Sequence, residues 1–179
     1  MSFDPTQIEE KFREHLQYVD DTVMIVLKGH LLIEEALESI LTTVVFHPEF
    51  LEAASLRFAQ KVNVARSLSL DEHQNELWGL VISLNALRNE LAHSLKEGKR
   101  KKKLAALREI YYRLVADSPE DLRDPDLPDQ LVIYWSVAMI LGFLDAFKGE
   151  VTRFRALVDD LDKIVNPHRH AGREAADAG

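Results

Sequence analysis

Apolar residues recur every three or four positions along most of this chain, which is the spacing of a helix with one buried face. The clearest example is a leucine stripe between residues 72 and 97, made of Leu77, Leu80, Leu84, Leu87, Leu91 and Leu95. Almost no segment alternates apolar and polar residues as a half-buried strand does. The pattern therefore predicts an all-α protein, an up-and-down bundle of five to six helices with the leucine stripe in its core.

Prolines and capping residues divide this pattern into six helices. Asp4-Pro5-Thr6-Gln7 has the features of a helix start, and His47-Pro48 separates the second helix from the third. Gly98, with Lys96 before it, is expected to end the helix that carries the leucine stripe. The predicted helices cover residues 5–19, 22–46, 48–68, 72–97, 101–115 and 130–164, with a proline-broken acidic loop at 117–129.

The length of 179 residues fits one domain with a sizeable core, predicted at residues 1–165, followed by a flexible tail at 166–179. Tyr134 and Trp135 at the start of the last helix are expected in this core. The first residues lack the pattern of a signal peptide. The longest apolar run, Leu131 to Leu144, is too short to span a bilayer. We therefore expect a cytoplasmic protein with no membrane segment.

Cysteine is absent from the chain, which excludes disulfides, thiolate nucleophiles and cysteine-ligated zinc. No glycine-rich phosphate loop is present, and no cofactor is expected. The net charge of −8 argues against general affinity for nucleic acids.

The helix with the leucine stripe carries a second stripe that is only partly polar. At about 100° per residue, one side of this helix collects Trp78, Ile82, Asn85, Asn89 and His93. A helix with large apolar residues on both sides is not simply half-solvated. The simplest partner for the second side is another copy of the chain, so we predict a homodimer with this helix near the two-fold axis.

The segment Arg88-Asn89-Glu90-Leu91-Ala92-His93 in the same helix has a polar residue directly after an arginine and a histidine five positions after it. RNA can be cleaved without a metal when one group accepts the 2′-hydroxyl proton, another protonates the 5′-oxygen and a cation stabilises the phosphorane. Histidine suits proton transfer at neutral pH, and arginine is a fixed, forked donor to phosphate oxygens. The alternative is that Arg88 pairs with a nearby carboxylate and His93 is an ordinary exposed histidine.

This R-x4-H pattern, on a long internal helix of a small helical chain, resembles the HEPN superfamily of helical-bundle proteins, many of which are metal-independent ribonucleases. The resemblance covers the motif helix specifically and residues 6–164 by helix order and length alone. It implies a HEPN-like fold, a dimer with a composite cleft, and RNA cleavage to 2′,3′-cyclic phosphate and 5′-hydroxyl ends. It also implies a toxin or defence role with a neutralising antitoxin protein.

The catalytic residues that match the HEPN pattern are Arg88, Asn89 and His93. The function that follows is a metal-independent endoribonuclease with RNA as its substrate. The superfamily also contains members without activity. A non-catalytic helical dimer that acts as an interaction or regulatory module is therefore the alternative.

Further polar residues lie near these positions by helical spacing. Asn89 precedes His93 by one turn, from where it could fix the tautomer of the ring. Glu90 and His93 have the i, i+3 spacing of di-metal carboxylate bundles, but such a site needs a second E-x-x-H, which this chain lacks. On the second helix, His30 and Glu34 either support the motif helix or belong to a solvated, salt-bridged edge.

One block of this acidic chain is strongly basic, and it begins three residues after His93. Beside a phosphodiester-cutting site, these side chains would hold the RNA backbone with salt-dependent affinity. Otherwise they form a solvated loop. The block consists of Lys96, Lys99, Arg100, Lys101, Lys102 and Lys103.

Overall fold

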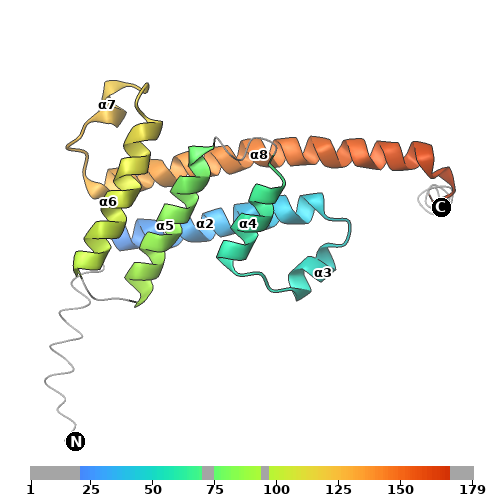
Figure 1. Ribbon diagram of the computed structural model, residues 1–179, viewed down its shortest axis with the longest axis horizontal. Helices are drawn as coiled ribbons and strands as arrows, with labels where there is room; N and C mark the ends of the chain where they lie inside the picture. The colour runs from blue at the N-terminus through green and yellow to red at the C-terminus, as the bar shows by residue number, and fades with distance from the viewer. Residues whose placement is uncertain (1–20, 70–74, 94–96, 170–179) are drawn as a thin grey trace, which may run out of the picture. The chain divides into compact units, whose positions relative to one another are not determined.

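The computed structural model describes residues 21–69, 75–93 and 97–169. The part of the chain that it describes is all-α, with no strand, which confirms the predicted fold class (Figure 1). The helices are α2 (Asp21–Val44), α3 (Pro48–Ala53), α4 (Phe58–Ser67), α5 (Glu76–His93), α6 (Glu97–Leu114), α7 (Glu120–Arg123), α8 (Asp129–Val165) and the short 3₁₀ helix η2 (Pro167–Arg169). The first predicted helix, at residues 5–19, lies outside the described residues.

The chain divides into two compact units, and the divisions fall within the long helices α2 and α8. Unit 1 comprises residues 1–35 and 70–143, and therefore holds α5, α6 and α7 with the first parts of α2 and α8. Unit 2 comprises residues 36–69 and 144–179, and holds α3 and α4 with the second parts of α2 and α8. The candidate motif lies in unit 1.

The middle of the leucine stripe lies in the core of unit 1, and Leu95 lies outside the described residues. Leu80, Leu84 and Leu87 are almost completely buried, as predicted, whereas Leu77 and Leu91 near the ends of the helix are half-buried. Helix α6 lies beside α5 and runs in the opposite direction (Figure 1). Residues spaced three or four positions apart form its buried face, namely Leu104, Leu107, Tyr111 and Val115.

The second stripe of α5 does not form one free surface. Trp78 is buried, with 1% of its surface exposed, and its ring meets Phe143 of α8 edge-on at 5.0 Å between centroids. The prediction that Trp78 belongs to a face open to a second chain is therefore wrong, because helices of the same unit cover this end of the stripe. Ile82, Asn89 and His93 remain exposed.

Helix α6 begins at Glu97, earlier than predicted, so Gly98 lies inside its first turn and does not end the motif helix. The motif helix ends at His93 within the described residues. Lysine and arginine have high helix propensity, which allows the basic block to continue as helix. Residues 99–103 are therefore the first turns of α6 and not a loop.

The acidic loop after α6 is fastened to that helix by Arg108. Its guanidinium donates to the backbone oxygens of Leu127 and Pro125, both at 2.9 Å, and forms an ion pair with Asp129. The buried hydroxyl of Tyr111 donates to the Leu122 oxygen at 3.0 Å, and burial raises the pKa of this phenol above its ordinary value. These contacts order a segment that the sequence predicts as a loop and that contains the short helix α7.

In unit 2, the predicted third helix at residues 48–68 is wrong as a continuous element. It is interrupted between α3 and α4, where Ser55 adopts a positive φ of 48°. The N–H of Arg57 then donates to the Gln60 side chain at 2.9 Å, which caps the start of α4. No proline or glycine marks the break, so the sequence pattern alone does not reveal it.

Helix α8 covers residues 129–165, close to the prediction of 130–164. By length and composition alone α8 could cross a membrane, a test that core helices also pass. The same stretch supplies core residues, among them Val132, Ile133 and Ile140. Tyr134 and Trp135, predicted in the core, are exposed because they lie on the other side of the helix.

Candidate functional site

The three matched residues lie in the last two turns of α5. Arg88 is half-buried, whereas Asn89 and His93 are exposed. The turn before them is anchored in the core through Leu84 and Leu87, so the backbone that carries the motif is held firmly. Five residues at about 100° each separate Arg88 and His93 by about 140° around the helix axis. One copy of α5 therefore presents the two side chains in different directions.

Arg88 contacts the residue that follows it. Its Nη1 donates to Asn89 Oδ1 at 3.3 Å, and Arg88 forms no ion pair with any carboxylate in the described ranges. Within those ranges, no hydrogen bond joins Asn89 to His93, so the expected role of Asn89 in fixing the histidine tautomer is not seen. Asn89 instead orients the guanidinium, whose remaining N–H groups are available to a phosphate.

A buried polar pair links α2 to the motif helix one turn before Asn89. His30 is 5% exposed, and its Nε2 lies 3.1 Å from Asn85 Oδ1, so the tautomer with hydrogen on Nε2 donates to the amide. Glu34 Oε2 lies 4.0 Å from His30 Nδ1 on the other side of the ring. The structure therefore brings His30 to α5, as one of the two interpretations of the sequence expects, with Glu34 behind it.

Glu90 occupies the centre of the motif and is half-buried. Its Oε1 is buried and has no hydrogen-bond partner among the residues that the structure describes. Burial of a hydrogen-bond acceptor that has no donor raises the free energy of the folded chain. A donor from a bound molecule or a second chain would therefore form a favourable hydrogen bond with this oxygen. No group of three or more histidine, aspartate or glutamate side chains in the described ranges is arranged to hold a metal ion.

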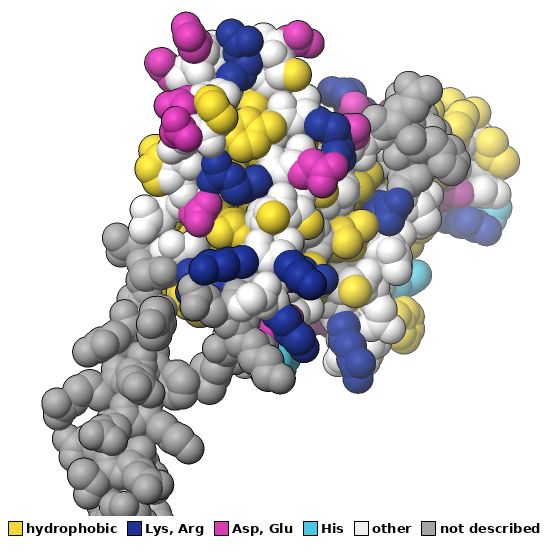
Figure 2. Space-filling view, turned by 60° about the vertical axis from the view of Figure 1, so that its left-hand side comes forward, with side chains coloured by type: hydrophobic (Ala, Val, Ile, Leu, Met, Phe, Trp, Pro, Cys, Tyr) yellow, Lys and Arg dark blue, Asp and Glu magenta, His cyan; other side chains and the backbone are white. Residues whose placement is uncertain are grey.

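The basic block lies at the start of α6, the helix that packs against α5. Lys99, Lys101, Lys102 and Lys103 are exposed, and Arg100 is half-buried, while Lys96 lies outside the described residues. Figure 2 shows lysine and arginine side chains along the lower part of one face, at the height where α6 begins. Acidic side chains gather near the top, at the level of α7.

A pocket in unit 2 is a feature that the sequence does not predict. It lies between α2, α3 and α4 and is lined by residues up to 23 positions apart in the chain, the separation of Glu38 and Lys61. The only signal in the sequence is a lysine at an inward position of an amphipathic helix. That signal does not reveal the partner of the lysine.

Comparison with protein-family models, with curated proteins and with solved structures found no match to this chain.

Proposed function

We propose that the chain is a HEPN-like, metal-independent endoribonuclease whose catalytic residues are Arg88, Asn89 and His93. The observation that carries the proposal is the placement of the motif. An arginine bonded to the adjacent asparagine and an exposed histidine lie at the end of a helix whose preceding turns are buried. A strongly basic helix start packs beside it.

The proposed reaction is transesterification within RNA. The 2′-oxygen attacks the adjacent phosphorus, the bond from phosphorus to the 5′-oxygen breaks, and a 2′,3′-cyclic phosphate and a 5′-hydroxyl are formed. The proton leaves the 2′-hydroxyl for a base, and an acid gives a proton to the departing 5′-oxygen. His93 supplies proton transfer, and the Arg88 guanidinium, oriented by Asn89, stabilises the negative charge on the phosphorane oxygens.

Two copies of the chain would complete the site. Arg88 and His93 diverge by about 140° on one helix, so a two-fold arrangement that pairs the exposed ends of two α5 helices would bring residues from both copies around one phosphate. Ile82 supports this arrangement because it is an apolar residue with 45% of its surface exposed on the same helix. The His30–Asn85 pair would hold the helix in position.

Purified full-length protein, free of any inhibitor, is expected to cut single-stranded RNA in the presence of EDTA. His93→Ala and Arg88→Ala should each lower the rate by on the order of 10²–10⁴, while circular dichroism and thermal unfolding stay unchanged because neither side chain belongs to the leucine core. His168→Ala, which removes an exposed histidine of η2, is the matched control and should cut as wild type does.

Replacement of Lys101, Lys102 and Lys103 by glutamine should weaken RNA binding and flatten its dependence on salt, without removing the chemistry. If the folded protein leaves varied RNAs intact, the ribonuclease proposal is wrong. The second candidate, an interaction module without catalysis, is favoured by the exposed Ile82 and would use the same surface for a partner protein. If the chain is a toxin, an antitoxin protein would cover Arg88 and His93.

A further inference from the structure

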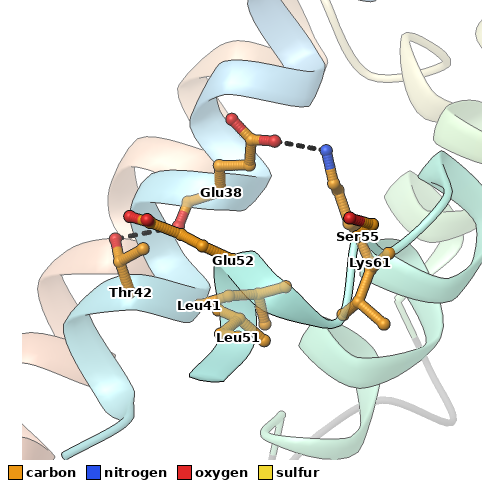
Figure 3. Close-up of a pocket in the computed structure, with 8 residues that line it drawn as sticks. Glu38, Leu41, Thr42, Leu51, Glu52, Ser55 and Lys61 are labelled. Atoms are coloured by element: carbon orange, nitrogen blue, oxygen red, sulfur yellow. Dashed lines mark hydrogen bonds and ion pairs between the residues drawn. The ribbon is translucent and has the colours of Figure 1, made fainter. Parts of the chain in front are cut away.

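The pocket in unit 2 is a partly open hollow with the volume of a small-molecule site. Its volume is about 450 Å³, within the range of ligand pockets. Figure 3 shows its residues converging from α2, α3 and α4. The lining comprises Glu38, Leu41, Thr42, Leu51, Glu52, Ser55, Leu56 and Lys61. All of them belong to unit 2, so the pocket is independent of the proposed ribonuclease site.

The pocket exists because α3 and α4 are separate helices. A turn follows α3 at Ser55, whose φ of 48° is unusual for a residue with a Cβ. Helix α3 consequently has no buried residue, and it serves as a wall of the pocket instead of a core helix. Leu51 and Leu56 are half-buried, and Leu41 is almost completely buried. These three side chains supply an apolar surface within the pocket.

Two of the three charged side chains that line the pocket form an ion pair with each other. Lys61 is 10% exposed and forms an ion pair with Glu38, whose side chain is 56% exposed; the two point toward each other in Figure 3. Glu52 is exposed, and its carboxylate forms no hydrogen bond or ion pair with another described residue. The Thr42 hydroxyl is bonded to backbone oxygens of its own helix. The lining therefore carries one negative charge in excess.

We propose that this pocket binds an aliphatic ammonium group. The Glu52 carboxylate and the outer oxygen of Glu38 would accept its hydrogen bonds, and the alkyl chain would pack on Leu41, Leu51 and Leu56. A cation neutralises the excess charge, whereas an anion would add to it, because Lys61 is already paired with Glu38. Such a group belongs either to a free alkylamine or to a lysine side chain of another protein.

Titration calorimetry of the full-length chain with n-hexylamine tests the proposal. Saturable binding of one hexylammonium per chain is expected, with at least tenfold weaker binding of hexanoate and hexanol, which share the chain length but lack the cation. Nα-acetyl-lysine methylamide distinguishes the two sources. Equal or tighter binding of this compound assigns the pocket to a lysine side chain, and weaker binding assigns it to a free amine.

Two variants of the pocket lining and one control outside it test whether hexylamine binds in this pocket. Glu52→Gln keeps the shape of the side chain but removes its charge, and should weaken hexylamine binding roughly tenfold, the loss expected for one charge-assisted hydrogen bond. Glu49→Gln makes the same change on the same helix, but outside the pocket lining, and should stay within about twofold of wild type. Leu51→Trp fills the cavity and should abolish binding, with thermal unfolding to confirm that the variant is folded.

The proposal is overturned if hexylamine and the lysine derivative both fail to bind at millimolar concentration. Equal binding of hexanoate, or equal effects of Glu52→Gln and Glu49→Gln, would also overturn it. None of these results depends on RNA cleavage, so they leave the ribonuclease proposal to its own experiment.

Discussion

Leu87 and Leu91 occupy the same stripe of α5 at different depths. Leu87 is 1% exposed, whereas Leu91, one turn further along, is half-buried. The sequence period places both residues on the same side of the helix, because it predicts only the angular position of a residue around the helix axis. Depth depends on how far the neighbouring helices extend, and that is a property of the packed unit.

Leu87→Ala is expected to lower the free energy of unfolding by about 2–5 kcal/mol, because it removes buried methyl groups and leaves a cavity. Leu91→Ala makes the same chemical change at a half-buried position and should cost roughly half as much or less, since less apolar area is lost. Urea unfolding followed by circular dichroism measures both. Equal losses for the two variants would contradict the difference in burial.

At the scale of elements, the close approach of α2 and α8 in unit 1 depends on one glycine. A Cβ on Gly29 would lie 2.5 Å from Cγ2 of Val137, much closer than van der Waals contact. Valine has few rotamers in a helix, so Val137 cannot turn away easily. Gly29 therefore permits this close packing, although glycine is unfavourable in a helix interior by about 1 kcal/mol.

Gly29→Ala should therefore destabilise the protein by roughly 1–3 kcal/mol, the range for overpacking, despite the better helix propensity of alanine. In the double variant Gly29→Ala/Val137→Ala, the clash is removed, so the double variant should lose less stability than the sum of the two single variants. Thermal unfolding of all four proteins gives the coupling. Additive losses, or a stabilised Gly29→Ala, would show that the helices do not depend on this contact.

Elements also differ in how well their ends can be predicted. Helix α8 matches its prediction within a residue at each end, because Pro128 precedes it and the apolar period continues to residue 165. Helices α3 and α4 were predicted as one because no breaker separates them. The positive φ of Ser55 and the hydrogen bond from the Arg57 N–H to the Gln60 side chain set the boundary between α3 and α4. These contacts form only when the flanking helices pack.

At the scale of the whole molecule, charged and apolar side chains are unevenly distributed along the chain. The chain carries a net charge of −8, yet exposed lysines cluster at the start of α6 beside the motif helix. Exposed apolar residues occur on α5, at Ile82, and on the second part of α8, at Leu157 and Leu161. Single exposed apolar residues are ordinary on protein surfaces, so the proposed dimer contact at Ile82 is tested by substitution.

If the chain is a ribonuclease that acts as a homodimer through α5, Ile82→Asp should convert it to monomers, because a buried carboxylate without a partner strongly opposes association. RNA cleavage should fall with it, since the composite site is lost. Sedimentation velocity measures the assembly. Leu157→Asp changes an exposed leucine of α8 in the same way and serves as the control. A dimer that persists in Ile82→Asp, or dissociates only in Leu157→Asp, would contradict an interface on α5.

The sequence by itself determined the fold class, most helix positions and the residues of the candidate motif. These follow from local rules, because helical period, proline and residue chemistry are properties of neighbouring positions. His30 was recognised as a polar residue on the second helix, but the sequence did not identify Asn85 as its partner. The burial of Trp78 was also missed, because apolar spacing cannot distinguish a face covered by the same unit from one that awaits a second chain.

Tertiary structure alone decided which side chains meet. The contact between His30 and Asn85, the ion pair of Glu38 with Lys61, and the pocket beside α3 each join residues from different helices. Their geometry depends on the depth, rotation and spacing of packed helices, which no period along one helix specifies. The residue types at the end of α5 can therefore be read from the sequence alone. The His30–Asn85 contact that links α2 to this helix and the pocket in unit 2 depend on how the helices pack.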